Sequence, residues 1–282
     1  MELKIAVVTA VTYKGKNEKE VNIKRALKYI DEASEKGAKI ICFPESFPGP
    51  WSDDNMYSPV EELAKKAAER KVYVICGTLE LVQKKPEHYY NTEVLIGSRG
   101  QIIGKYRRTT PHGPWMYKGG PLWNYNYEVG NDLPVFNTEY CKIGILVCSE
   151  VYTPELARIL SLKGAEIIFM PMGATRPKLW ETWITLLKAR AYENLAITAA
   201  SRNVFGTEDG LAIITGPEKT LLQSVEPGVH VAVVDLERLR WLRNTEDKWN
   251  NVLPYSVKPG LLTQWRRPEL YEEIVKVIRL KE

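Results

Sequence analysis

The chain has 282 residues, of which 44% are apolar, and its 39 basic against 35 acidic side chains leave a formal net charge of +4. This length and apolar content allow a sizeable core to be buried, which excludes an intrinsically disordered protein. The charge excess is too small to favour nucleic acid or an anionic membrane surface as a partner. No apolar run approaches the roughly 20 residues of a transmembrane helix, so we expect no membrane partner either.

The cysteines and histidines argue against a metal centre and for a reducing compartment. The cysteines show no CxxC spacing and mostly lie in apolar segments, where free thiols are expected. They are Cys42, Cys76, Cys141 and Cys148. The histidines, His88, His112 and His230, are far apart in the sequence. The chain begins directly with a predicted strand and shows no signal-peptide pattern, so we expect a cytoplasmic protein.

Strand-like and helix-like segments alternate along the first half of the chain. Short apolar runs predict strands at residues 3–11, 39–43, 72–79, 91–96 and 101–107. Apolar residues at helical spacing predict a helix over residues 18–36, with Gly37 at its C-terminal cap. A second helix is expected to open with a capping box at Ser58 and with Pro59 at its first position. Residues 97–100 predict a hairpin turn between the last two strands.

The second half repeats the pattern of the first. The segment KGAEIIFMP at residues 163–171 matches KGAKIICFP at residues 36–44, with the same order of helix end, glycine, strand and proline. Predicted strands lie at residues 142–147, 195–200, 211–215 and 229–235, and predicted helices at 154–163 and around Trp180, Trp183, Leu187 and Ala191. The repeat predicts a duplicated βαβ half within one α/β domain over residues 1–250, because no linker separates the halves.

Residues 251–282 differ from the duplicated part. They contain Pro254, Pro259 and Pro268, followed by a short amphipathic helix predicted over residues 269–280. We expect this C-terminal arm to pack on the body of the protein or at a subunit interface.

Two predicted strands end at residues that can carry chemistry. Glu45 follows the strand at residues 39–43, and Cys148 follows the strand at residues 142–147. Reactive groups in α/β layers gather beyond the carboxyl ends of strands, and the duplication would bring these two ends together. A buried carboxylate can then accept the thiol proton, and the thiolate is the nucleophile. Taken singly, however, such a cysteine is more often a small core residue, and such a glutamate is more often a solvated acid or a helix cap.

The wider sequence context resembles the carbon–nitrogen hydrolase (nitrilase) superfamily. The strings are FPE at 43–45, GKYR at 104–107, GILVCSEVYTPELAR at 144–158, KGAEII at 163–168 and RAYEN at 190–194, followed by Asn203. The resemblance implies a four-layer αββα sandwich with internal pseudo-two-fold duplication, assembled as a homodimer or larger homo-oligomer with help from the C-terminal arm. It also implies hydrolysis of a small linear amide, carbamoyl amine or nitrile, without a metal or organic cofactor.

The resemblance implies roles for individual residues. Glu45 matches the general base and Cys148 the nucleophile that forms a thioester. The backbone N–H of Ser149 would donate to the oxyanion together with the family's catalytic lysine. At the lysine position, after the Tyr-Arg string at residues 106–107, this chain has Arg108. Arginine keeps the positive charge and the donors, but it does not release a proton at ordinary pH.

The arginine leaves two alternatives open. Lys118, in the following loop, could supply the missing lysine, whereas Lys105 should point to the opposite face of its strand. The protein could also be a catalytically silent family member that binds a small ligand in the same cleft. The aromatic segment at residues 111–127, which includes His112 and Trp115, predicts a wall of the substrate pocket or an ordinary packed loop.

Two further acids are pocket candidates. Many family members carry a supporting glutamate beyond the lysine, where this chain has Met116 or Trp123, and Glu128 is the nearest acid. Glu150 is either a pocket residue or a hydrogen-bonded structural acid. The family has Asp at this place in many amidases and Glu in many nitrilases, which leaves the substrate class open. We predict a carbon–nitrogen hydrolase, as an amidase in preference to a nitrilase.

Overall fold

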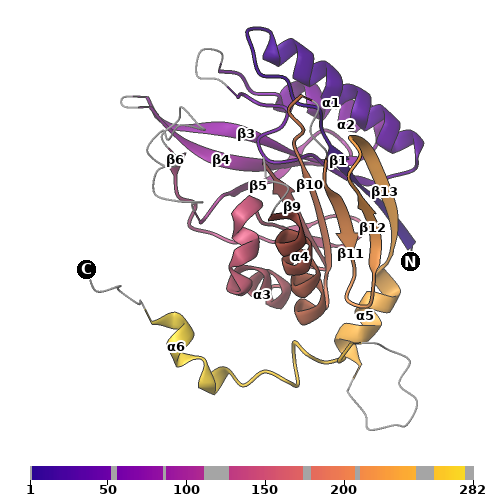
Figure 1. Ribbon diagram of the computed structural model, residues 1–282, viewed down its shortest axis with the longest axis vertical. Coiled ribbons are helices and arrows are strands. Elements are labelled where there is room, and N and C mark those ends of the chain that lie inside the picture. Colours follow the sequence, from indigo (N-terminus) through magenta and orange to yellow (C-terminus); the bar gives the residue numbers. More distant parts are fainter. Residues whose placement is uncertain are drawn as a thin grey trace.

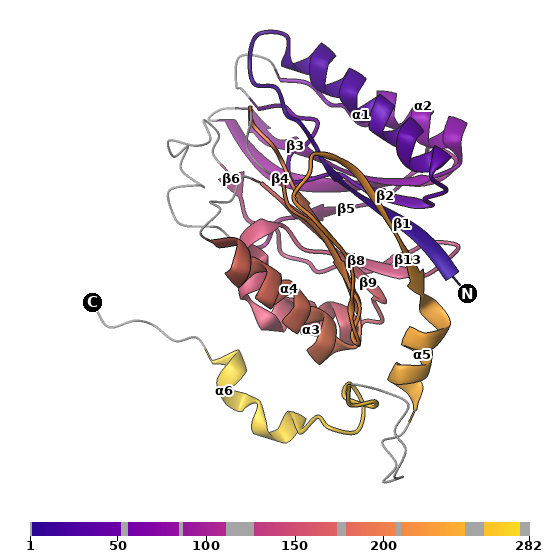
Figure 2. The same cartoon turned by 45° about the vertical axis from the view of Figure 1, so that its right-hand side comes forward.

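The fold is an α/β sandwich of four layers. The computed structural model describes residues 2–51, 56–84, 87–110, 127–173, 179–206, 210–245 and 257–276. Two β-sheets face each other, and helices cover the outer face of each sheet (Figures 1 and 2). The predicted αββα arrangement is confirmed.

The first sheet has the strand order β13-β1-β2-β3-β4-β5, with the short strand β6 beside β4. Its strands are β1 (Glu2–Thr9), β2 (Ile40–Cys42), β3 (Tyr73–Lys84), β4 (Glu87–Ile96), β5 (Ile102–Arg107), β6 (Tyr127–Glu128) and β13 (Gly228–Asp235). Strands β1, β2 and β3 are parallel and are connected by α1 (Glu18–Glu35) and α2 (Val60–Arg70). Strands β3, β4 and β5 are antiparallel.

The second sheet has the order β12-β11-β10-β9-β8-β7. Its strands are β7 (Phe136–Asn137), β8 (Lys142–Ile145), β9 (Ile167–Met172), β10 (Ile197–Arg202), β11 (Ala212–Thr215) and β12 (Thr220–Ser224). Strands β8, β9 and β10 are parallel, with α3 (Pro154–Leu162) and α4 (Trp180–Asn194) as connections. Each sheet thus runs from an antiparallel edge strand through three parallel strands to two antiparallel ones. This is the predicted duplication.

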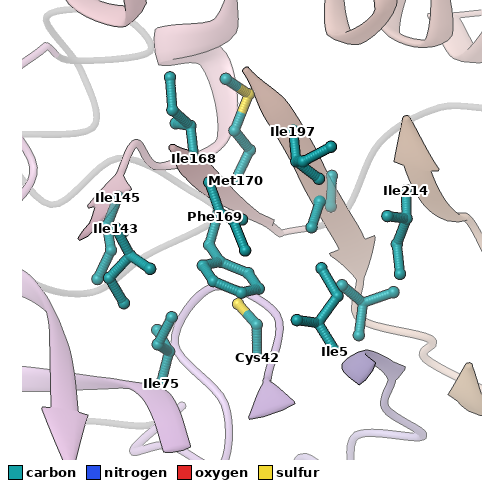
Figure 3. Close-up of a cluster of buried hydrophobic side chains, with 14 of the residues drawn as sticks. Ile5, Cys42, Ile75, Ile143, Ile145, Ile168, Phe169, Met170, Ile197 and Ile214 are labelled. Carbon is teal, nitrogen blue, oxygen red and sulfur yellow. The ribbon is translucent and has the colours of Figure 1, made fainter. Parts of the chain in front are cut away.

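The apolar runs of the parallel strands account for the layering. Every residue of β2 and β9 is buried, as expected for strands covered on both faces. Between the sheets, Ile5 and Ile75 of the first sheet point toward Phe169 of the second (Figure 3). A second apolar cluster fills the space between the first sheet and helices α1 and α2.

The boundaries of α1 and α3 agree with the predicted ones to within one residue, and the start of α2 differs. Gly37 has a φ of +88°, the left-handed conformation that a helix-terminating glycine adopts at low steric cost. The capping box predicted at Ser58 is wrong. Helix α2 begins one residue later than expected, so Pro59 is its N-cap and no side chain caps it. Ser58 makes only a long contact of 3.4 Å with the Val60 N–H.

The C-terminal arm is less helical than the sequence predicted. After α5 (Leu236–Asn244), the described part of the arm holds only the 3₁₀ turn η5 (Pro268–Leu270) and α6 (Glu272–Val275). No residue of these two turns is buried, and a short helix without packing is not stable on its own. Residues 277–282 of the predicted helix lie outside the described residues. None of the helices described is long and apolar enough to cross a membrane.

Candidate active site

Glu45 lies in a tight turn beyond the end of β2. It is 1% exposed, and the next residue, Ser46, has a φ of +54°. The turn is held from the other sheet, because Asn203 Nδ2 donates to the Glu45 carbonyl oxygen at 2.8 Å. Asn203 is itself held by Thr12, whose hydroxyl donates to its Oδ1 at 2.6 Å. Residues that follow β1 and β10 therefore fix the backbone that carries Glu45.

The Glu45 carboxylate is held by two donors on one oxygen. Asn91 Nδ2 lies 2.8 Å and Arg108 Nη1 lies 2.9 Å from its Oε1. The side chains of Glu45 and Arg108 are 2% and 3% exposed, so this ion pair is almost completely shielded from water. The second oxygen, Oε2, lies against Gly173, where a Cβ atom would come within 2.7 Å of it. Glycine is required there because the backbone and the carboxylate approach so closely.

Arg108 connects Glu45 to the turn of the second sheet. Its N–H donates to the Asn91 carbonyl oxygen at 2.9 Å, which extends the β4–β5 ladder by one residue. Its side chain therefore lies on the inner face of the sheet, where Nη2 donates to Ser149 Oγ at 2.5 Å and Nε to the Thr110 carbonyl oxygen at 3.0 Å. Lys105 lies on the opposite face and pairs with Glu80.

Cys148 occupies a strained turn at the end of the second sheet. It begins the 3₁₀ helix η3 (Cys148–Tyr152) with a φ of +54°, which is unusual for a residue with a side chain. Burial, followed by the negative charge of Glu45, raises the pKa of its thiol to about 12, and Arg108 and the Gly173 N–H act in the opposite direction. The Cys148 thiol and the Glu45 carboxylate are near enough for the carboxylate to act on the thiol pKa. Cys148 is partly exposed, whereas the other three cysteines are buried.

Glu150 is a structural acid that joins the two sheets. Its Oε1 accepts from the backbone N–H groups of Thr109 and Thr110 at 2.7 and 2.9 Å. Its Oε2 accepts from the Tyr106 hydroxyl and from the Val147 N–H, both at 2.6 Å. The carboxylate thus ties the chain after Arg108 to the turn that carries Cys148.

The structure brings together Glu45, Arg108, Cys148, Ser149 and Glu150, and it separates or leaves out the other candidates. Glu128 forms an ion pair with His88 and is about half exposed. His112, Trp115 and Lys118 lie outside the described residues, as do Met116 and Trp123. The predicted pocket wall is therefore not part of the site described.

Sequence reasoning missed the residues that orient Glu45. Asn91 and Gly173 received no role, and Asn203 was only part of the resemblance. A signal existed for Asn91, because it is a polar residue in an apolar strand and has the same parity as the core residue Leu95. Gly173 carried no signal, because its closeness to Glu45 depends on how the sheets face each other.

Comparison with known proteins agrees with this geometry. The profile of the carbon-nitrogen hydrolase family matches residues 4–267. The nitrilase of Pyrococcus abyssi (strain GE5 / Orsay) is 31% identical over 79% of this chain and 87% of its own length. The omega-amidase NIT2 of Xenopus tropicalis is 32% identical over 65% of this chain and 69% of its own. A carbon-nitrogen hydrolase structure from Helicobacter pylori G27 matches with a TM-score of 0.80 at 21% identity, covering 98% of this chain and 99% of that chain. The chain therefore belongs to the carbon-nitrogen hydrolase family.

Proposed function

We propose that this protein is an amidase that hydrolyses a small linear amide through a thioester on Cys148. The observation that carries the proposal is the orientation of Glu45. Asn91 and Arg108 hold its Oε1, and the carboxylate lies near enough to the Cys148 thiol to raise the thiol pKa. A carboxylate fixed in this way is placed to take the thiol proton as the sulfur attacks.

In the first half-reaction, Glu45 accepts the proton of Cys148 while the sulfur bonds to the amide carbon. Burial and the charge of Glu45 raise the thiol pKa, which favours transfer of the proton to Glu45 together with the attack. Glu45 then passes the proton to the leaving nitrogen, the carbon–nitrogen bond breaks, and ammonia departs. In the second half-reaction, Glu45 takes a proton from water, whose oxygen attacks the thioester, and the carboxylic acid leaves as the thiol is restored.

Arg108 and the Ser149 N–H are assigned to the oxyanion. The guanidinium extends from Glu45 to Ser149 Oγ, so its charge lies between the base and the residue after the nucleophile. Because a guanidinium keeps its proton at ordinary pH, Arg108 supplies charge and donors only, and Glu45 moves the protons. A preorganised cation at a developing oxyanion is among the largest single contributions to catalysis.

The preference for an amide over a nitrile depends on whether Glu150 argues for a nitrile. One relative is named an omega-amidase and another a nitrilase, so the names alone do not decide. A glutamate at position 150 would favour a nitrile only if it faced the substrate. The Glu150 carboxylate is buried and bonded through both oxygens to protein groups, which removes that argument.

The test is ammonia release from a panel of short aliphatic and aromatic amides, carbamoyl amino acids and nitriles. We expect turnover of at least one linear amide, and an acyl adduct on Cys148 in intact-mass spectra with a slow amide. Cys148→Ala should lose both the adduct and the turnover. The matched control is Cys141→Ala, which removes a buried thiol and should keep both. An adduct on another cysteine, or turnover by Cys148→Ala, would contradict the assignment.

The contacts of Arg108 support a second candidate function. Its guanidinium bonds Glu45, Thr110 and Ser149 simultaneously, so a substrate carbonyl would have to compete for a donor that is already engaged. A catalytically silent protein that binds a small ligand in this cleft is consistent with that arrangement. Such a protein would release no ammonia from any member of the panel and would bind an amide without forming an adduct.

A further inference from the structure

A second glutamate lies buried directly behind the proposed base. Glu93 is on β4, in register with Gly77 of β3 and with Tyr106 of β5. Its side chain is 0% exposed and faces the space between the two sheets. On the same face of β4, Asn91 is the next residue toward the active site. Glu93 therefore occupies the row of side chains beneath the one that holds Glu45.

The Glu93 carboxyl and the turn of Glu45 share the space above Gly77. A Cβ atom on Gly77 would lie 3.0 Å from Glu93 Oε1 and 2.2 Å from the Ser46 nitrogen. Both groups therefore lie so close to the Gly77 Cα that a side chain at this position of β3 would clash with them. The carboxyl of Glu93 thus supports the turn that carries the proposed general base.

No described residue offers Glu93 a hydrogen bond of good geometry. Neither of its carboxyl oxygens has a partner. The nearby Ser46 N–H lowers the pKa of Glu93, but by less than burial raises it. Asn91 and Arg108, the donors of the next row, both bind Glu45 instead. Burial first, and the charge of Glu45 second, raise the pKa of Glu93 well above its ordinary value.

The titratable groups around Glu93 do not offset its charge. They are Glu45 in the turn after β2, Cys42 on β2, Cys76 on β3, and Tyr106 and Arg108 on and after β5. Burial raises the pKa of Cys42, Cys76 and Tyr106, so these groups are neutral at ordinary pH. Arg108 is paired with Glu45. Neutral Glu93 therefore adds no second negative charge beside the ion pair of Glu45 and Arg108.

We propose that Glu93 is a positioning residue that works as a neutral acid, supporting the turn of Glu45 and keeping a further negative charge away from the Glu45 carboxylate. This inference rests on the proposed function. When Glu93 loses its proton at alkaline pH, its charge opposes formation of the Cys148 thiolate and of the oxyanion. Glu93 thus sets an alkaline limit on the reactivity of Cys148 without touching the substrate.

The proton on Glu93 is tested first without any activity, through stability. The folded protein holds this proton above the ordinary glutamate pKa of about 4.3, whereas the unfolded chain releases it, so wild type loses stability as pH rises. Glu93→Gln keeps the shape and neutrality of the acid and lacks this loss. The unfolding constant of wild type relative to Glu93→Gln should rise about tenfold per pH unit from about pH 5 up to the raised pKa.

The matched control is Glu80→Gln, the same change on the neighbouring strand β3 and on the opposite face of the sheet. Hydrogen bonds from Arg107 and Lys105 lower the pKa of Glu80, so its effect on stability changes only at acidic pH. Above about pH 6, the difference between Glu80→Gln and wild type should be constant. If Glu93→Gln also differed from wild type by a constant amount, Glu93 would not hold a proton and the proposal would be wrong.

The effect on Cys148 is tested by alkylation with iodoacetamide as a function of pH, followed by mass. At pH about 7 both proteins carry a neutral group at position 93, so Glu93→Gln should react within about twofold of wild type. Above the Glu93 transition, the variant should react about tenfold faster than wild type, which corresponds to one pKa unit. The amidase pH profile should extend to higher pH in the same variant. Coinciding alkylation profiles would overturn the proposal.

Two further outcomes separate this inference from the proposed function. If no substrate is turned over but the stability and alkylation differences are found, the amidase proposal fails and the assignment of Glu93 stands. If Glu93→Gln does not fold, the infrared spectrum of wild type with ¹³C-labelled glutamate decides. A neutral carboxyl band that persists at about pH 7 supports the proposal, and its absence overturns it.

Discussion

Arg108 keeps a positive charge at the proposed active site but holds it on a guanidinium rather than on an ammonium group. An ammonium group at this position would be a compact point charge, whereas the guanidinium presents a planar set of donors. In this protein those donors reach Glu45, Thr110 and Ser149. The site therefore has a rigid cationic bridge between the proposed base and the turn after the proposed nucleophile.

Two replacements of Arg108 test whether the proposed reaction needs its positive charge or the shape of its guanidinium. Arg108→Ala removes the cation and leaves the buried Glu45 charge without its partner, so we expect a loss of at least about 10²–10³ in kcat for an active enzyme. Arg108→Lys restores a cation and should retain or raise that rate. The measurement is ammonia release on one amide by wild type and both variants.

The matched control for Arg108 is Arg107→Lys. Arg107 is the preceding residue on the outer face of β5, where it pairs with Glu80, and its replacement should leave kcat unchanged. A neutral result for Arg108→Ala would mean that another group supplies the charge, with Lys118 the first to examine. Turnover that appears only in Arg108→Lys would identify a family member made silent at this position.

At the scale of elements, the end of β5 and the 3₁₀ helix η3 behave as one unit. Glu150 is the group that joins them, since it accepts from Thr109 and Thr110 after β5 and from Val147 before η3. These two segments carry Arg108 and Cys148. Their relative position depends on one buried carboxylate rather than on a continuous strand pairing.

Glu150→Gln should therefore weaken both the fold and the site. The amide has one oxygen where the carboxylate has two, and its NH₂ group would face N–H donors. Because hydrogen bonds to charged groups contribute about 1.5–3 kcal/mol each, we expect a loss of roughly 2–4 kcal/mol in unfolding free energy and a lower kcat. Urea unfolding measures the first effect. Glu155→Gln, an exposed change in the first turn of α3, is the control and should be near neutral.

At the scale of the whole molecule, the duplication places the two reactive turns opposite each other. In the first half, the second parallel strand, β2, is followed by a turn with a positive φ at Ser46. In the second half, the first parallel strand, β8, is followed by a turn with a positive φ at Cys148. Packing of the inner faces then brings Glu45 and Cys148 into contact. The C-terminal arm lies outside this arrangement, as its course away from α5 in Figure 2 shows.

We expect the C-terminal arm to pack at a subunit interface. Trp265, Leu270, Ile274 and Val275 are 53–80% exposed, which is unusual for large apolar side chains gathered on one short segment. Truncation at about residue 252 should lower the number of subunits per particle found by light scattering. Replacing Leu270 and Ile274 by serine in the full chain should have the same effect, whereas serine at the exposed polar residues Glu272 and Glu273 should not. If the truncated protein kept the same number of subunits, the arm would only stabilise its own chain.

Local sequence patterns were enough to predict the type and order of most elements. Apolar periodicity, glycines and prolines are local signals, and they placed the strands β1, β2, β8 and β10 and the helices α1 and α3 to within two residues. The repeat of residues 36–44 in residues 163–171 predicted the duplicated sheets. The short strands β6 and β7 and the exposed strand β12 were not predicted, because two or five residues without strong alternation carry little signal.

The hydrogen bonds that hold the candidate residues could be found only in the tertiary structure. Asn91 and Asn203 bind Glu45 from positions 46 and 158 residues away, and no local pattern records such contacts. The same holds for Glu93, whose isolation follows from the register of β3, β4 and β5 and from donors that bind Glu45 instead. Local sequence determines which face of a strand a side chain occupies. The facing of two sheets determines which of those side chains meet, and thereby which buried carboxyl is charged and which is neutral.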